Sequence, residues 1–171
     1  MQTHVTFPSP GTFTSAPLRN LIRVELYAPA SEVWTLLGDL SRLPEYSGGL
    51  ERVTVKKNAS GVPEEYTCYF KPTEEGGAGA VARDLLRWYE PNRGWASVDA
   101  GPNDFGLEHS LHLVTLSPAE RGTQVSWEAY YDTTDLDSNR TELDHALADI
   151  ADRLIARFGG RVLDRYVEGL R

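Results

Sequence analysis

The sequence predicts an α+β fold in which a curved, seven-stranded antiparallel sheet surrounds one long C-terminal helix. Seven short runs rich in β-branched and aromatic residues are separated by Gly, Pro, Asn and Asp. Strands joined by short turns pair antiparallel, and a helix can cover one face of such a sheet. Near the C-terminus, apolar residues recur at steps of three and four, which is the spacing of one helical face.

The length and composition indicate one globular domain. The chain has 171 residues, of which 40% are hydrophobic and 25% charged, which is enough for a substantial core. Residues 1–17 contain three prolines and no periodic pattern, so we expect a tail or a strap across the surface. Residues 18–171 should form the single domain.

The first predicted strand, at 20–27, is followed by two short helices. Pro29 fits the first turn of a helix, and Gly38-Asp39 separates it from a second short helix over 40–46. Six further strands follow, with short turns between them. They are predicted at 50–56, 62–70, 81–89, 95–100, 107–116 and 123–131.

The long helix is predicted over residues 138–166. Its apolar face contains Leu143, Leu147, Ile150, Leu154 and Phe158. Ile155, Val162 and Tyr166 form a second stripe, rotated by about a quarter turn at 3.6 residues per turn, and the change falls at Gly159-Gly160. Two compatible interpretations remain open there: a bend in the helix, or missing side chains that leave cavity volume.

A strongly twisted sheet that bends around one helix need not touch it along its whole length. The gap becomes a cavity lined from both sides. Aromatic residues are concentrated on the predicted strands and the first helix, and Tyr and Trp suit such a wall because they combine apolar area with one polar group. The alternative is that they fill the core. Leu154 and Phe158 of the long helix face the same space. The candidate ligand-binding residues are therefore Trp34, Tyr46, Tyr66, Phe70, Trp88, Trp95, Trp127, Tyr131, Leu154 and Phe158.

Strand alternation adds polar candidates to this wall. Alternation turns Asp84 inward together with Trp88. Asp84 could be a general acid or base, a ligand anchor, or a carboxylate neutralised by an arginine. In the strand predicted at 107–116, the alternation of apolar residues changes face partway along, as it would at a β-bulge. One of His109 and His112 should therefore face inward. Asp84, His109 and His112 are therefore the candidate catalytic residues.

Other chemistries lack their residue patterns. His109 and His112 are three positions apart on a strand and cannot chelate one ion, and neither H-E-x-x-H nor paired cysteines occur. No G-x-S-x-G motif is present, and Cys68, the only cysteine, is expected to be a buried, unreactive thiol. The glycines at 76, 77 and 79 precede a strand and no Lys-Ser follows them, so they should form a turn rather than a phosphate cradle. We expect no metal and no cofactor.

The charge of the chain limits its partners. The formal net charge of -8 opposes surfaces that must neutralise phosphates or anionic lipids. Nucleic acid is therefore not an expected partner. Nor is stable membrane insertion, because the sequence has no long apolar run. A cytoplasmic location is expected, and a monomer and a homodimer both remain possible.

Scattered motifs over residues 20–168 resemble a known superfamily. They are Ala28-Pro29-Ala-Ser-Glu-Val33-Trp34, Gly38-Asp39-Leu40-Ser41-Arg42-Leu43-Pro44-Glu45-Tyr46, Tyr89-Glu90-Pro91 and Gly122-Thr123-Gln124-Val125-Ser126-Trp127. With them the chain resembles the START/Bet v 1-like (SRPBCC, helix-grip) superfamily, within it the polyketide cyclase/dehydrase-like group. The resemblance implies a hydrophobic cavity between the sheet and the C-terminal helix, and it transfers no invariant catalytic motif.

Three functions remain open. The first is binding or carriage of a small hydrophobic molecule such as a lipid, a polyketide or an aromatic intermediate. The second is a cofactor-free polyketide cyclase, aromatase or dehydratase in which the same polar groups move protons. The third is a protein-interaction module. The first is preferred, because no acid and base occur at a diagnostic spacing.

Overall fold

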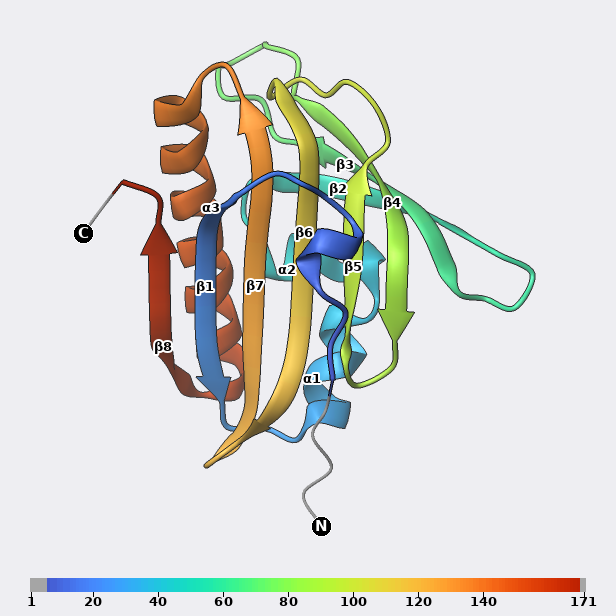
Figure 1. Ribbon diagram of the computed structural model, residues 1–171, viewed down its shortest axis with the longest axis vertical. Coiled ribbons are helices and arrows are strands. Elements are labelled where there is room, and N and C mark those ends of the chain that lie inside the picture. The colour runs from blue at the N-terminus through green and yellow to red at the C-terminus, as the bar shows by residue number, and fades with distance from the viewer. Residues whose placement is uncertain (1–5, 170–171) are drawn as a thin grey trace.

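The computed structural model describes residues 6–169 and confirms the α+β fold (Figure 1). Residues 1–5 of the expected tail, with His4, and residues 170–171 lie outside the described residues. The strands are β1 (Leu18–Leu26), β2 (Leu50–Lys57), β3 (Pro63–Phe70), β4 (Val81–Glu90), β5 (Gly94–Asp99), β6 (Leu107–Ala119), β7 (Gly122–Thr133) and β8 (Gly160–Val167). The helices are α1 (Ala30–Leu37), α2 (Leu43–Tyr46) and α3 (Leu136–Phe158), with short 3-10 turns η1 (Pro10–Thr12) and η2 (Leu40–Arg42).

The strands form a single sheet in the order β2-β3-β4-β5-β6-β7-β1-β8. Consecutive strands from β2 to β7 are neighbours and antiparallel, as the short turns predict. Strand β1 lies between β7 and β8 and pairs antiparallel with both. Over residues 6–169 the sheet therefore has eight strands rather than the predicted seven.

The additional strand, β8, corrects the prediction for the C-terminus. The predicted helix over 138–166 ends at Phe158, and the chain reverses to pair with β1. Gly159 and Gly160 have φ values of 71° and 147°, which side-chain-bearing residues rarely adopt. A Cβ on Gly160 would lie 2.1 Å from the carbonyl oxygen of Glu25. The glycine pair is thus a helix stop and a close strand contact; it is neither a bend nor a thin point in a cavity wall.

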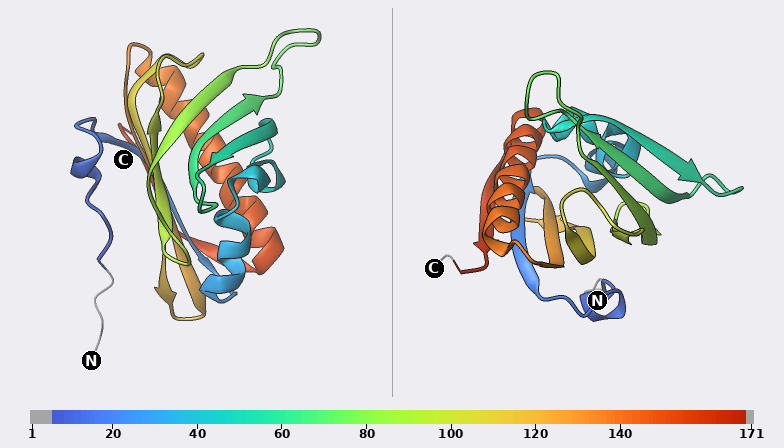
Figure 2. Two further views of the ribbon diagram at one scale, coloured as in Figure 1. Left: turned by 90° about the vertical axis from the view of Figure 1, so that its right-hand side faces the viewer. Right: turned by 90° about the horizontal axis from the view of Figure 1, so that it is seen from above.

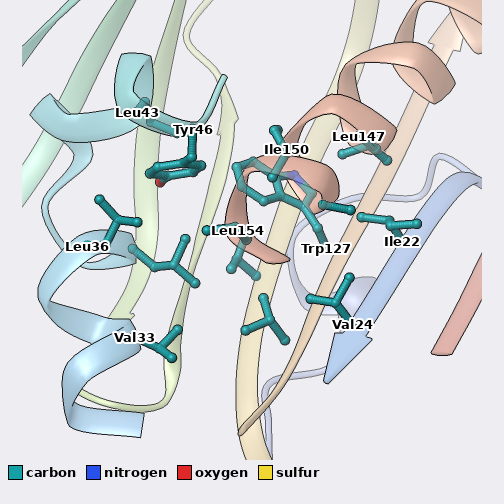
Figure 3. Packing of buried hydrophobic residues seen from close by; sticks show 14 of the residues in the cluster. Ile22, Val24, Val33, Leu36, Leu43, Tyr46, Trp127, Leu147, Ile150 and Leu154 are labelled. Carbon is teal, nitrogen blue, oxygen red and sulfur yellow. The ribbon is translucent and has the colours of Figure 1, made fainter. Parts of the chain in front are cut away.

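The helices cover the concave side of the sheet in two groups. Helix α3 packs on β1, β7 and β8, whereas α2 packs against β2. Figure 3 shows the resulting core, with α1 and α2 side chains on one side and α3 side chains on the other. Its labelled residues are Ile22, Val24, Val33, Leu36, Leu43, Tyr46, Trp127, Leu147, Ile150 and Leu154.

The N-terminal segment lies on the opposite, convex face of the sheet (Figure 2). Phe13 packs on a small buried cluster formed by Ala96, Leu111 and Leu113. The ring of Phe7 meets Trp88 edge-on with the centroids 6.3 Å apart. These contacts cover apolar residues of β4, β5 and β6 that would otherwise face water.

We expect Gly160→Ala to lower the free energy of unfolding by roughly 3 kcal/mol, because it adds a steric clash to an unfavourable φ. Gly61→Ala is the matched control, since Gly61 also has a positive φ of 79° but no heavy atom within 4 Å of the position that a Cβ would take; it should cost only about 1 kcal/mol. Urea denaturation of both variants measures the difference. Equal costs would mean that close packing on β1 does not require the glycine.

Candidate functional site

A cavity of about 180 Å³ lies where α3 and the sheet separate. Its walls come from α2, β2, β3, β4, β6, β7, the β5–β6 loop and the N-terminal half of α3. The lining residues are Leu43, Ser47, Leu50, Tyr66, Cys68, Phe70, Ala82, Asp84, Asn103, Phe105, Leu107, Ser110, His112, Trp127, Asn139, Glu142, Leu143, Ala146, Leu147 and Ile150.

Most of the cavity wall is apolar, and one end is open. Phe105, from the β5–β6 loop, meets Phe70 edge-on at a centroid distance of 4.9 Å. Asn103 shapes this loop, since its Oδ1 accepts from the backbone N–H groups of Phe105 at 3.0 Å and Leu107 at 3.2 Å. Glu142 and Ala146 of α3 line the cavity and are also exposed, so they mark its mouth.

The main polar cluster at the cavity is formed by side chains from three adjacent strands. The register places Tyr66 of β3 opposite Asp84 of β4, and the Tyr66 hydroxyl donates to Asp84 Oδ2 at 2.8 Å. Ser97 Oγ of β5 lies 2.8 Å from the same hydroxyl. Because Tyr66 has one proton and donates it to Asp84, Ser97 is the donor to Tyr66. Burial, then the nearby Asp84 charge, hold the pKa of Tyr66 well above its ordinary value, so this donor stays protonated.

Asp84 has no cationic partner among residues 6–169. Its hydrogen-bond partner is the Tyr66 hydroxyl, and Ser97 Oγ, whose proton goes to Tyr66, lies 3.4 Å from Oδ2. The interpretation that an arginine neutralises Asp84 is therefore wrong for this part of the chain. Asp84 instead presents a carboxylate without a cationic partner to a largely apolar space.

A bulge in β6 decides which histidine faces the cavity. The pairing with β7 shifts between Glu108 and Leu111, where His109 has a φ of 52°. As a result His112 lines the cavity, while His109 is exposed and its carbonyl oxygen accepts from Thr14 Oγ1 at 2.7 Å.

His112 is held as a neutral imidazole. Its Nδ1 accepts from Trp127 Nε1 at 3.2 Å, so the proton of the neutral ring is on Nε2. Burial lowers the pKa of His112, and the Asp84 charge opposes this only in part. The cavity therefore contains an N–H donor beside the Asp84 carboxylate acceptor.

Three of the ten predicted ligand-binding residues lie in the lining: Tyr66, Phe70 and Trp127. A bulge between Leu86 and Trp88 turns Trp88 to the convex face, which corrects the expectation that it shares a face with Asp84. Tyr89 points inward in its place and donates to the Gly38 carbonyl at 2.9 Å.

The other predicted aromatic residues stabilise the core or a separate groove. Trp95 is fully buried and its Nε1 donates to the Leu37 carbonyl at 3.0 Å. Tyr131 is buried and donates to Asn20 Oδ1 at 2.8 Å. Outside the cavity lining lie Trp34, Tyr46, Trp88, Trp95, Tyr131, Leu154 and Phe158.

A second hollow lies between α1 and the β2–β3 hairpin. It has a volume of about 260 Å³, and Trp34, Tyr89 and Lys57 are among its lining residues. It is more open to solvent and much less apolar than the first cavity. We therefore place the candidate site in the first cavity, despite its smaller volume.

Several residues of the site were missed in the sequence. Ser97, which lies behind the lining and contacts the Tyr66 hydroxyl, is on the same face of β5 as Trp95, so alternation could have found it. Phe105 and Asn103 lie in a loop without periodicity, and no sequence signal marks them. Cys68 lines the cavity as a buried thiol, and burial raises its pKa to about 12, so it remains protonated and unreactive.

We expect protonation of His112 to destabilise the fold. Its pKa in the folded chain lies below the unfolded value of about 6.5, so its contribution to stability is present above that pH and is lost as the pH falls toward the folded pKa. Between about pH 7.5 and pH 5, the free energy of unfolding should fall more in the native chain than in His112→Asn. Urea denaturation across this range measures the difference.

His109→Asn is the control, because asparagine tolerates the positive φ of this exposed position. It should keep the pH dependence of the native chain. If His112→Asn also keeps that dependence, the imidazole is not held neutral.

Comparison with solved structures shows the same fold. A START superfamily protein from Mycobacterium smegmatis has a TM-score of 0.68 and 13% identity, over 83% of this chain and 97% of that one. The protein XoxI from Bacillus cereus has a TM-score of 0.67 and 14% identity, over 82% and 95% of the two chains. A Chromobacterium violaceum protein has a TM-score of 0.63 and 16% identity, over 82% and 98%. At these identities the likeness concerns the fold alone.

No curated protein sequence matches this chain. In residues 6–169, no helix has the length and apolar character needed to cross a bilayer. The model of the family described as "Polyketide cyclase / dehydrase and lipid transport" matches residues 22–166, a span that includes most of β1, all three α-helices and nearly all of β8. The chain belongs to this polyketide cyclase/dehydrase and lipid transport family.

Proposed function

We propose that this protein binds or carries a small hydrophobic molecule in the cavity between α3 and the sheet. The observation that carries the proposal is the cavity itself, which has a largely apolar wall and a few convergent polar groups. Ligand sites of proteins have this composition, because apolar area gives affinity and a few polar groups fix orientation. Family membership is consistent with it.

The volume limits the ligand. At about 180 Å³ the cavity is smaller than the roughly 300–1,000 Å³ of pockets for drug-sized molecules. It is closer to an engineered cavity of about 150 Å³ that binds benzene. A compact molecule with one or two rings fits this space, whereas a long acyl chain would have to extend through the mouth at Glu142 and Ala146.

A cofactor-free cyclase, aromatase or dehydratase is the second candidate. Asp84 and His112 line the same cavity, one as a carboxylate acceptor and the other as a neutral N–H donor. Two such groups around one substrate can position it and move protons. Conversion of a bound molecule that is lost in Asp84→Asn or His112→Ala, with the fold intact, would favour this candidate over carriage.

We expect Ala146→Phe to block the cavity mouth and abolish binding. The control is Ala156→Phe, which makes the same change at an exposed position of α3 outside the lining. The protein is purified natively, its bound molecules are extracted and identified by mass spectrometry, and each variant is then titrated with the class found. Loss of binding in Ala146→Phe alone supports the proposal.

The measurement can also contradict the proposal. Two results together would show that the cavity is not a binding site. The purified protein would contain no small molecule, and both variants would bind small uncharged aromatic compounds with the same affinity as the native chain. Equal binding by Ala146→Phe and the native chain would place any bound molecule elsewhere.

A further inference from the structure

The charges of the cavity lining are all of one sign. Its two ionisable acidic residues are Asp84, inside, and Glu142, at the mouth. Neither lysine nor arginine is among the described residues that line it, and His112 is neutral. A ligand that carried a carboxylate or a phosphate would therefore enter an apolar space with two like charges and no compensating cation.

The Asp84 carboxylate has acceptor capacity to spare. Oδ2 accepts from Tyr66, whereas Oδ1 has no donor among residues 6–169. A carboxylate that faces a largely apolar cavity is stabilised by a donor, and most strongly by a charged donor. The unused oxygen is thus a specific position for a ligand N–H group.

The walls favour the same kind of ligand. Phe70, Phe105 and Trp127 line the cavity with Tyr66, and aromatic side chains offer large apolar area to the hydrocarbon part of a ligand. The apolar rings and the single carboxylate together match a molecule that is hydrophobic at one end and positively charged at the other.

We propose that the cavity selects compact hydrophobic amines, whose protonated nitrogen binds Asp84 Oδ1 while the hydrocarbon part packs against Phe70, Phe105 and Trp127. This inference rests on the proposed function and specifies its ligand class. Anionic molecules with the same hydrocarbon part bind least tightly, because their charge repels Asp84. Neutral alcohols bind with intermediate affinity, because a hydroxyl can donate to Asp84 without neutralising it.

Three single-ring probes with similar chains test the selectivity: 2-phenylethylamine, 2-phenylethanol and 3-phenylpropanoate. Binding to the full chain is measured at neutral pH by NMR titration. Salt at about 0.5 M screens the general attraction of a chain with net charge -8 for cations. We expect the amine to bind at least about tenfold more tightly than the carboxylate, as a hydrogen bond between charged groups implies.

Asp84→Asn isolates the contribution of the charge. It should weaken binding of the amine about tenfold, and binding of the alcohol by less, because the alcohol carries no charge. Urea denaturation shows whether the variant is folded. Asp152→Asn is the matched control: it removes a carboxylate from an exposed position of α3 that does not line the cavity. Asp152→Asn should keep the preference for the amine.

Tyr66→Phe gives a second, independent variant. It removes the hydroxyl that occupies Oδ2 of Asp84 and keeps the carboxylate, so the preference for the amine should persist or increase. Equal or tighter binding of the carboxylate, or an amine preference unchanged in Asp84→Asn, would overturn the inference and leave hydrophobic binding standing. If none of the three probes binds, both the amine inference and the proposal of a compact ligand are wrong.

Discussion

The limited coverage of the sheet by α3 is the constraint on which the rest of the structure depends. A single helix cannot cover the concave side of an eight-stranded sheet, and α3 makes its main sheet contacts with β1, β7 and β8. Helices α1 and α2 cover another part of the same side and share one core with α3. Where the two groups of helices separate, no side chains fill the space, and the cavity forms there.

The polar groups of the cavity follow from the same arrangement. Sheet pairing brings Tyr66, Asp84 and Ser97 together from three strands, and the neighbouring pair of β6 and β7 brings His112 to Trp127. Tyr66 satisfies part of the Asp84 carboxylate, and burial lowers the pKa of His112 and so favours its neutral form. Because the surrounding walls are apolar, electrostatic differences between ligands are stronger there than in water. The proposed selectivity for ligand charge therefore follows from strand register.

The two faces of the sheet are connected through an irregular region of β6. The bulge at His109 exposes that residue near the N-terminal segment and turns the side chain of His112 into the cavity. Thr14, from the N-terminal segment, donates to the carbonyl oxygen of His109, and Phe13 packs close by on Leu111 and Leu113. The segment that covers the convex face thus supports the strand that carries a polar group of the cavity.

The sequence by itself determined the α+β class, the seven strands from β1 to β7, both short helices and α3 as far as Phe158, because side-chain periodicity and turn residues are local. It also indicated that Asp84 and one β6 histidine face inward. Only the tertiary structure decided that β8 pairs with β1, that bulges turn Trp88 outward and His112 inward, and that Asp84 has hydroxyl rather than arginine partners. Each of these depends on contacts between residues far apart in the chain. One extra residue in a strand reverses every side chain beyond it, and local periodicity contains no information about the partner strand that accommodates the bulge.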